Sequence, residues 1–389
     1  MKERYNIVIC ICFSAMLLIP AFIALFGIKE TAESKENKQL AGLPQFTVKR
    51  LDPFPVKFEN WFNDHFTFRN TLISQHGKLF VKAFHISSKP KLVGIGKEGW
   101  LYLMNSEIDN YTGDLKVSEA LQKRCLEELN WRYDTCKSMG AEFMLVVIPS
   151  KPTVYPEYLP AYVHKSKSEN GTDKFLNHFK GKAKFKLLDL RQTIIDAKVK
   201  GQLFYRSDNH WNDLSSYTAY TEIMKFMNQN GYNLTTFPIS QCRQTDSIFN
   251  SGNVAGMIDM YKEFEEPAHF IYPQTNSILV PRNKENYKVE EGFPYPWTYE
   301  EARQNVNPDL PGLLIFRESF TTSKLMDLMG TSFGRSTFIF DSWQHKLNLE
   351  ILKKEKPKVV ICMVLESFLN TIPYNACKPS LISTNPKKN

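Results

Sequence analysis

The sequence is poor in cysteine and lacks the spacings in which cysteine builds small domains. Its 389 residues include seven cysteines, and none lies in a CxxC pair with a matching second pair. This excludes a disulfide-framework mini-domain and the common zinc ribbons. Cys125 and Cys136 lie on one predicted helix about 16 Å apart along its axis, too far for a disulfide. With 42% hydrophobic and 23% charged residues, the chain instead has the composition of an ordinary globular protein.

Few features of the charge pattern point to nucleic acid. The chain has 49 Lys and Arg against 41 Asp and Glu, a formal net charge of +8, but Lys and Glu are interspersed along most of it. It contains no arginine-rich helix and no aromatic RNA-binding signature, so nucleic acid is not an expected partner. A basic surface also suits acidic envelope polymers or anionic lipid, and charge alone does not choose between them.

One long uncharged run stands near the start, at Ile7–Ile28. A helix rises about 1.5 Å per residue, so these 22 residues can cross a hydrocarbon core of about 30 Å. Lys2 and Arg4 precede the run, which favours a cytoplasmic N-terminus and an exported body. The alternative is a cleaved signal peptide, whose apolar segment is normally only about 7–15 residues long. The predicted layout is a cytoplasmic start (1–6), a transmembrane anchor (7–28), a linker (29–39), an extracytoplasmic domain (40–375) and a polar tail (376–389).

The body alternates between strand and helix patterns. Glu142–Ile148 is an almost continuous apolar run, as expected for a strand buried on both faces of a parallel sheet. A hairpin is expected over 92–102, and residues 266–308 have the composition of an insertion or long loop. Further strands are predicted at 185–190, 203–206, 313–316, 336–340 and 359–364, and helices at 118–139, 213–229, 322–330 and 346–354. This alternation predicts an α/β layered fold with a mostly parallel central sheet flanked by helices.

The first candidate site is the segment Asp208-Asn-His210-Trp211. It follows a predicted strand and precedes a predicted helix, where α/β sheets carry their functional groups. An Asp two residues before a His can orient the imidazole so that its other nitrogen acts as a base. The alternative is a surface loop with a packed Trp211 and an N-capping Asp. No third ligand stands at a suitable spacing, so no metal is predicted.

The second candidate site is Arg317-Glu-Ser319-Phe. It follows the predicted strand 313–316, and Ser319 would lie at the turn into the next helix. A nucleophilic serine fits this position, with the N–H groups of the helix start available to an oxyanion. An ordinary N-capping serine is the alternative.

Other residues are weaker candidates for a functional site. Lys151 and Tyr155 follow a predicted strand and could line a sugar cleft. The remaining histidines lack a paired partner and are expected to be structural or exposed, with His345 the least certain.

The motif spellings resemble one known family. DNHW around His210 and RESF around Ser319 resemble the DxHW and DSF motifs of the SGNH-hydrolase-like polysaccharide O-acetyltransferases of the AlgJ and AlgX type, which take part in alginate acetylation. The resemblance continues through 58–69, 93–101, 148–156 and 358–366. One position departs from it, because the family usually has Asp where this chain has Glu318.

The resemblance implies an SGNH-hydrolase-like fold and a catalytic triad of Ser319 as nucleophile, His210 as base and Asp208 as its partner. It also implies acetylation of a cell-surface polysaccharide without a cofactor, with the acetyl group supplied by a multi-pass membrane acyltransferase. Two rivals stay open: an esterase with the same triad, and a catalytically silent scaffold that binds glycan or organises export.

Overall fold

The computed structural model describes residues 2–25, 41–46, 52–66, 68–289, 293, 295–341 and 343–382. The chain divides into two compact units. The first comprises residues 1–90 and 255–263, and the second comprises residues 91–254 and 264–389. The chain passes from the second unit to the first within a short helix, α10 (Asn253–Met257).

Three helices make up most of the described part of the first unit: α1 (Lys2–Leu25), α2 (Pro53–His65) and α3 (Arg69–Phe84). In α2 the aromatic side chains repeat every four residues, so Phe58 stacks between Phe54 and Phe62 with ring centroids 5.8 and 6.4 Å away. The aromatic rings therefore line one face of this helix.

The predicted membrane-spanning helix covered Ile7–Ile28. The structure describes a helix over most of that run, α1, and residues 26–28 lie outside the described residues, as does the predicted linker (29–39). Within the described part of the chain, no helix is both long enough and apolar enough to cross a membrane.

The second unit is built on a seven-stranded sheet with the order β4-β3-β11-β9-β10-β8-β7. The five strands from β4 to β10 are parallel, and β8 and β7 join antiparallel at one edge. The sheet is thus mixed: its central part is parallel as predicted, and its edge is not. The strands are β3 (Glu142–Ile148), β4 (Lys186–Asp189), β7 (Leu279–Val280), β8 (Glu300–Asn305), β9 (Leu313–Phe316), β10 (Arg335–Ile339) and β11 (Val359–Leu365).

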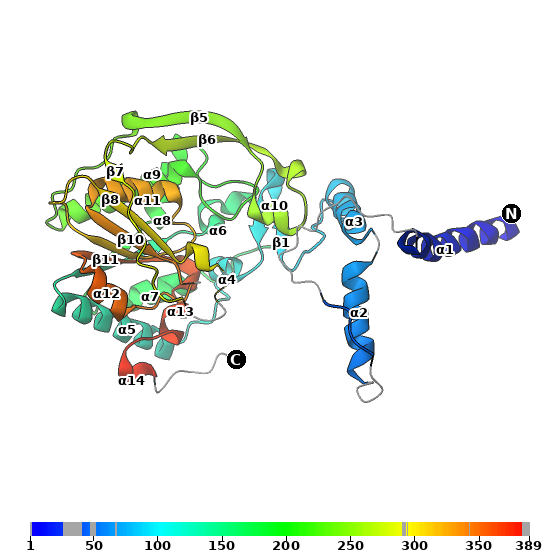
Figure 1. Cartoon of the computed structure of the whole chain (residues 1–389), viewed down its shortest axis with the longest axis horizontal. Helices are drawn as coiled ribbons and strands as arrows, with labels where there is room; N and C mark the ends of the chain where they lie inside the picture. The colour runs from blue at the N-terminus through cyan, green and yellow to red at the C-terminus, as the bar shows by residue number, and fades with distance from the viewer. Residues whose placement is uncertain are drawn as a thin grey trace. The chain divides into compact units, whose positions relative to one another are not determined.

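Helices cover both faces of this sheet (Figure 1). On one face α9 (Asp213–Gln229) and α11 (Ser323–Ser332) pack on inward side chains such as Ile315. On the other face α5 (Glu119–Ser138), α7 (Gly171–Phe179) and α12 (Leu349–Glu355) pack on Leu314 and its neighbours. Successive residues of a strand point to opposite faces, so a central strand must be apolar throughout. Short helices complete the unit: α4 (Ser106–Thr112), α6 (Lys151–Val154), α8 (Arg191–Asp196), α13 (Thr371–Tyr374) and α14 (Pro379–Ile382).

Two hairpins extend this core. The predicted hairpin over 92–102 is confirmed as β1 (Val93–Ile95) and β2 (Leu101–Leu103). A second, longer hairpin pairs β5 (Cys242–Phe249) with β6 (Glu266–Pro273).

Two expectations were wrong. Residues 203–206 do not form a strand of the sheet and make only an isolated bridge between Phe204 and Trp211. The stretch 266–308 is no mere loop, because it supplies β6, β7 and β8, two of which extend the central sheet. Its polar and proline-rich composition hides them because edge strands need only one apolar face.

Candidate active site

Asp208 and His210 lie in the loop before α9, and the loop turns so that their side chains meet. His210 Nδ1 lies 2.7 Å from Asp208 Oδ1, and the His210 backbone N–H donates to the same oxygen at 2.9 Å. The backbone N–H of Asn253 donates to Asp208 Oδ2 at 2.8 Å. Gly252 makes this approach possible, because a Cβ there would lie 2.4 Å from Ser207 Oγ. The carboxylate is therefore held on both oxygens and aims the ring.

Ser319 comes to the same place from the turn after β9. Its Oγ lies 2.9 Å from His210 Nε2. Since Asp208 accepts from Nδ1, Nε2 carries the lone pair and accepts the serine proton. The structure thus brings together all three residues that the two motifs pointed to, from positions more than 100 residues apart, in the order of a serine nucleophile, its base and an orienting carboxylate.

The electrostatics of the pair follow from burial and contact. Burial disfavours the charged forms of both Asp208 and His210, but the hydrogen bond between the two side chains outweighs this effect of burial. The pKa of His210 consequently lies above its usual value, with Glu107 adding to the effect, and the pKa of Asp208 lies below its usual value. The His210 side chain keeps 24% of its surface exposed, so a reactant can reach it while Asp208 stays covered and ionised.

Trp211 joins the two halves of the site. Its indole N–H donates to the carbonyl oxygen of Phe320 at 2.8 Å, and the two rings meet edge to face at 5.6 Å. Phe320 also lies against the His210 ring, with centroids 4.9 Å apart. The tryptophan of the DNHW motif therefore does more than pack: it holds the residue that follows Ser319.

Lys151 does not line a cleft, contrary to one of the expectations. Its ammonium group is buried and donates to the carbonyl oxygens of Leu101 (2.6 Å), Arg206 (2.8 Å) and Asp208 (2.8 Å). Burial lowers the pKa of Lys151 to about 7, against the opposing effect of the Asp208 charge. The lysine thus ties hairpin β1–β2 to the loop that carries Asp208.

Tyr155 is buried as well and plays a similar part. Its hydroxyl accepts from the backbone N–H of Leu203 at 2.9 Å, and its carbonyl accepts from the Tyr102 hydroxyl at 2.7 Å. Neither residue was recognisable as buried from sequence, because polar residues after a strand are normally solvated.

Two buried carboxyl groups surround the loop. Glu266 on β6 accepts from the backbone N–H groups of Arg206 and Ser207, both at 2.9 Å, and so clamps the loop to the β5–β6 hairpin. Glu107 on α4 lies within electrostatic reach of His210, and burial raises its pKa to about 7. Neither residue belongs to a recognisable motif, so the sequence offered no signal for them.

Glu318 points away from the catalytic pair. It is fully buried, with Oε1 2.7 Å from His345 Nε2 and 3.1 Å from the backbone nitrogen of Leu365. His345 is thus a structural residue, as expected for the histidines outside the motif. The Glu318 carboxylate therefore contributes to the structure of the turn and does not reach the side chains of Ser319 and His210.

The expected oxyanion donors need correction. Helix α11 begins at Ser323, four residues after Ser319, and its N-cap is Thr322. The turn itself is closed by the Thr321 N–H, which donates to the Glu318 carbonyl at 3.1 Å. The helix start therefore lies beyond the serine.

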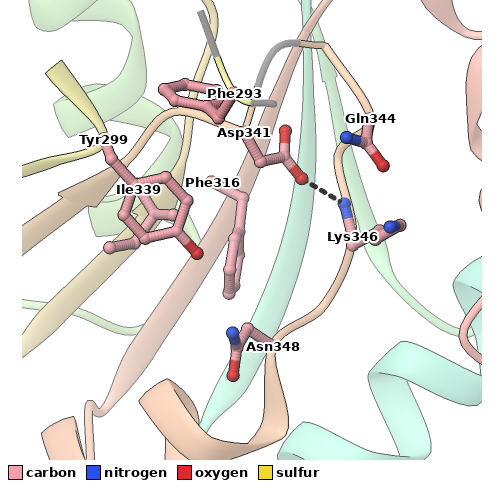
Figure 2. Close-up of a pocket in the computed structure, with 8 residues that line it drawn as sticks. All are labelled: Phe293, Tyr299, Phe316, Ile339, Asp341, Gln344, Lys346 and Asn348. Atoms are coloured by element: carbon pink, nitrogen blue, oxygen red, sulfur yellow. Dashed lines mark hydrogen bonds between the residues drawn. The ribbon is translucent and has the colours of Figure 1, made fainter. Parts of the chain in front are cut away.

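Several cavities lie on the described part of the second unit. Figure 2 shows a small one of about 50 Å³ beside the ends of β9 and β10, where Asp341 accepts from the Lys346 backbone N–H at 2.8 Å. That is far below the roughly 300–1,000 Å³ of ligand sites. A groove of about 500 Å³ lies between the β5–β6 hairpin and residues on either side of the Asp208–His210 segment, such as Tyr205 and Asn212; Asp208, His210 and Ser319 are not among its lining residues. A cavity of similar volume, about 460 Å³, is lined mostly by α5 together with Tyr374 and Leu381, so volume alone does not single out the groove.

No cluster of three or more His, Cys, Asp or Glu side chains suited to a metal ion occurs among the residues described.

Residues 93–276 match the family model described as SGNH hydrolase-like domain, acetyltransferase AlgX. The match spans a little under half of the chain; it includes Asp208 and His210 and ends before Ser319. The probable alginate O-acetylase AlgJ of Pseudomonas aeruginosa is 30% identical over 167 residues, which are 42% of this chain and 39% of that protein. The predicted resemblance to the SGNH-hydrolase-like O-acetyltransferases is confirmed.

Solved structures share the fold. The O-acetyltransferase domain of Pseudomonas putida AlgJ superposes with a TM-score of 0.50 at 17% identity, over 75% of this chain and 98% of that one. Bacillus cereus PatB1 gives a TM-score of 0.50 at 15% identity, over 70% and 95%. These likenesses establish the SGNH-like α/β fold. The chain spans well under half the length of the curated relatives that it matches.

Proposed function

We propose that this protein is an O-acetyltransferase that carries an acetyl group as an ester on Ser319 and passes it to hydroxyl groups of a cell-surface polysaccharide. The observation that carries the proposal is the line of hydrogen bonds from Ser319 Oγ to His210 Nε2 (2.9 Å) and from His210 Nδ1 to Asp208 Oδ1 (2.7 Å). Support comes from the relatives, which are named as probable alginate O-acetylases.

In the first half-reaction Ser319 Oγ attacks the acetyl carbonyl of the donor while His210 Nε2 takes the serine proton. The Ser319 N–H donates to the oxyanion, and Asp208 stabilises the imidazolium. When the intermediate collapses, the bond from acetyl carbon to donor breaks, and His210 returns the proton to the leaving group.

In the second half-reaction a sugar hydroxyl takes the place of the donor. His210 removes its proton, the sugar oxygen attacks the acetyl carbon of acetyl-Ser319, and Ser319 leaves as the alcohol with the proton from His210. Water can follow the same path, which would make the protein an esterase. Transfer requires the acceptor to exclude water from the face that His210 exposes.

We propose the groove beside the β5–β6 hairpin as the binding site of the acceptor, because its lining residues Tyr205 and Asn212 flank the Asp208–His210 segment in the chain. Its rim carries Gln244, Asp246 and His269, and the ring of His269 bridges the other two at 3.0 and 2.8 Å. Amide, carboxylate and imidazole groups of this kind bind sugar hydroxyls. The polysaccharide is therefore proposed as the macromolecular partner, and a multi-pass membrane acyltransferase as the source of acetyl.

We further propose that the N-terminal segment holds the domain at the outer face of a membrane, with residues 1–6 cytoplasmic, 7–28 as the anchor and the body from residue 40 outside. The support is the uncharged run Ile7–Ile28 behind Lys2 and Arg4. Mature protein should keep its N-terminus, sediment with membranes and be cut by protease added outside the cells. An N-terminus between Lys29 and Ser34 would mean a cleaved signal instead.

The acetyl-enzyme can be tested directly. The full chain, purified in detergent, is mixed with an activated acetyl ester, quenched in acid and analysed by mass spectrometry of its peptides. We expect one added acetyl group on Ser319. Ser319→Ala and His210→Ala should each abolish it, and the double variant should be scarcely worse, because nucleophile and base act as a unit.

The matched control is Ser323→Ala, which removes an exposed serine hydroxyl four residues away at the start of α11. It should acquire acetyl on Ser319 at the normal rate. In cells, Ser319→Ala should abolish polymer acetylation while polymer amount and protein level stay near normal. Full acetylation supported by Ser319→Ala would leave the non-catalytic scaffold as the better account.

A further inference from the structure

The residue before the nucleophile, Glu318, has a buried carboxyl group to which the proposed mechanism gives no step. The side chains of Glu318 and His345 are both 0% exposed, with Glu318 Oε1 2.7 Å from His345 Nε2. The Leu365 N–H donates to the same oxygen at 3.1 Å. Among the described residues neither Glu318 Oε2 nor His345 Nε2 has a partner in hydrogen-bonding geometry, so Glu318 and His345 meet as a close charge contact. The carboxylate therefore depends on His345 and one backbone amide, since a buried charge without a partner is strongly unfavourable.

His345 is held firmly from several elements. Its backbone N–H donates to Asp341 Oδ1 at 2.9 Å, and its carbonyl accepts from the Arg132 guanidinium, which is itself paired with Glu128 of α5 at 2.8 Å. Its backbone is in the left-handed region, with φ of 52°, which a residue with a Cβ adopts only when its surroundings enforce it. The imidazole is thus a fixed anchor.

The charges around this ring favour its protonated form. Burial by itself would lower the pKa of His345, but Glu318 and Asp341 outweigh both burial and the opposing charge of Arg132, so the pKa lies above its usual value.

Glu318 connects this anchor to the nucleophile. Its backbone carbonyl accepts from the Thr321 N–H that closes the turn, and its neighbour Ser319 must place Oγ 2.9 Å from His210 Nε2. The side chains of Glu318 and Ser319 leave the turn in different directions, one to the buried pair and one to the catalytic base. Because Glu318 and Ser319 are adjacent in this turn, a contact that holds the Glu318 side chain also holds the backbone from which Ser319 Oγ extends.

We propose that the Glu318–His345 pair is a positioning device that holds the Ser319 turn in its reactive geometry, and that the length of the glutamate is matched to this histidine. The inference rests on the proposed serine-ester function. It accounts for the departure from the family pattern: aspartate is one methylene shorter, and from the same backbone it would leave its carboxylate short of His345 and of the Leu365 amide.

The test measures the reactivity of Ser319 with a sulfonyl fluoride on the purified full chain, by mass spectrometry, at a temperature where thermal unfolding shows the variant folded. Glu318→Asp should slow labelling roughly 10–100-fold, the loss typical of a misplacement of about 1 Å. Turnover of an activated acetyl ester should fall by the same factor with KM unchanged, since the pair does not touch the ester. A general loss of structure would not produce that split.

A second pair of variants guards against misfolding of the first. His345→Ala should slow labelling as Glu318→Asp does, and His345→Gln, which keeps a donor for Glu318, should recover part of the rate. Combining Glu318→Asp with His345→Ala should be no worse than either alone, because both break one contact.

The matched control is Glu355→Gln. Glu355, at the end of α12, forms another buried ion pair of the second unit, with Arg282 at 2.8 Å, so the variant should lose stability and keep the labelling rate. A folded Glu318→Asp or His345→Ala protein that labels at the wild-type rate would overturn the positioning role. Failure of the wild-type protein to label on Ser319 would instead overturn the proposed function.

Discussion

Replacing Lys151 by methionine should change how stability depends on pH, in a direction that the structure dictates. The ammonium group is 1% exposed and serves three carbonyl oxygens. Its pKa in the folded protein is about 7, against 10.5 for the free side chain, chiefly because of burial. Between those values the unfolded chain binds a proton that the folded chain does not, so the free energy of unfolding contributed by this group rises with pH.

The size of the effect follows from the two pKa values. Each pH unit between them corresponds to about 1.4 kcal/mol, so keeping Lys151 charged at pH 7 and below costs about 5 kcal/mol against the unfolded chain. Methionine carries no proton and removes this dependence. The stability of the wild-type protein relative to Lys151→Met should therefore grow by roughly 2–3 kcal/mol from pH 7 to pH 9.

Urea unfolding of the full chain at pH 7, 8 and 9 measures this difference, and the contributions of groups that do not interact with Lys151 cancel between the two proteins. The control is Lys198→Met, because Lys198 also donates to a backbone carbonyl, that of Val154 at 2.9 Å, but remains 28% exposed. Its difference from wild type provides the comparison for a lysine whose side chain remains in contact with solvent. A difference between wild type and Lys151→Met that does not grow from pH 7 to pH 9 would refute the burial argument.

Two further predictions concern the site. Trp211→Phe keeps a buried ring but removes the donor to the Phe320 carbonyl. It should cost about 1–3 kcal/mol of stability and slow the labelling of Ser319 by a sulfonyl fluoride. A stable variant with unchanged labelling would contradict the role given to the indole. The rate of that labelling should rise with pH through the raised pKa of His210, because the base acts only when neutral. In Asp208→Asn this rise should move to lower pH while the maximal rate falls, on the order of 10⁴-fold; an unmoved profile would mean that Asp208 is not the partner of the base.

Much of the parallel core could be read from the chain. Glu142–Ile148 is a strand with the predicted bounds, and α9 covers the predicted 213–229. These elements were predictable because a continuous apolar run fits a strand buried on both faces, and apolar residues at helical spacing fit a helix packed on one face. The antiparallel strands β7 and β8 were missed, since an edge strand faces less protein and tolerates the polar sequence Glu-Glu-Ala-Arg-Gln-Asn of Glu300–Asn305. The strand predicted at 203–206 was wrong, because its apolar side chains serve a buried loop.

By itself the sequence determined which residues are the candidates for catalysis. Asp208, His210 and Ser319 stand in motifs whose residue types suit a serine nucleophile, and an α/β order places such motifs after strands. Only the tertiary structure decided what holds them. Lys151 satisfies carbonyls from two segments about 50 residues or more away, and Glu318 meets a histidine on another loop. A buried charge is tolerated only where folding brings partners to it, and partners distant along the chain leave no local pattern.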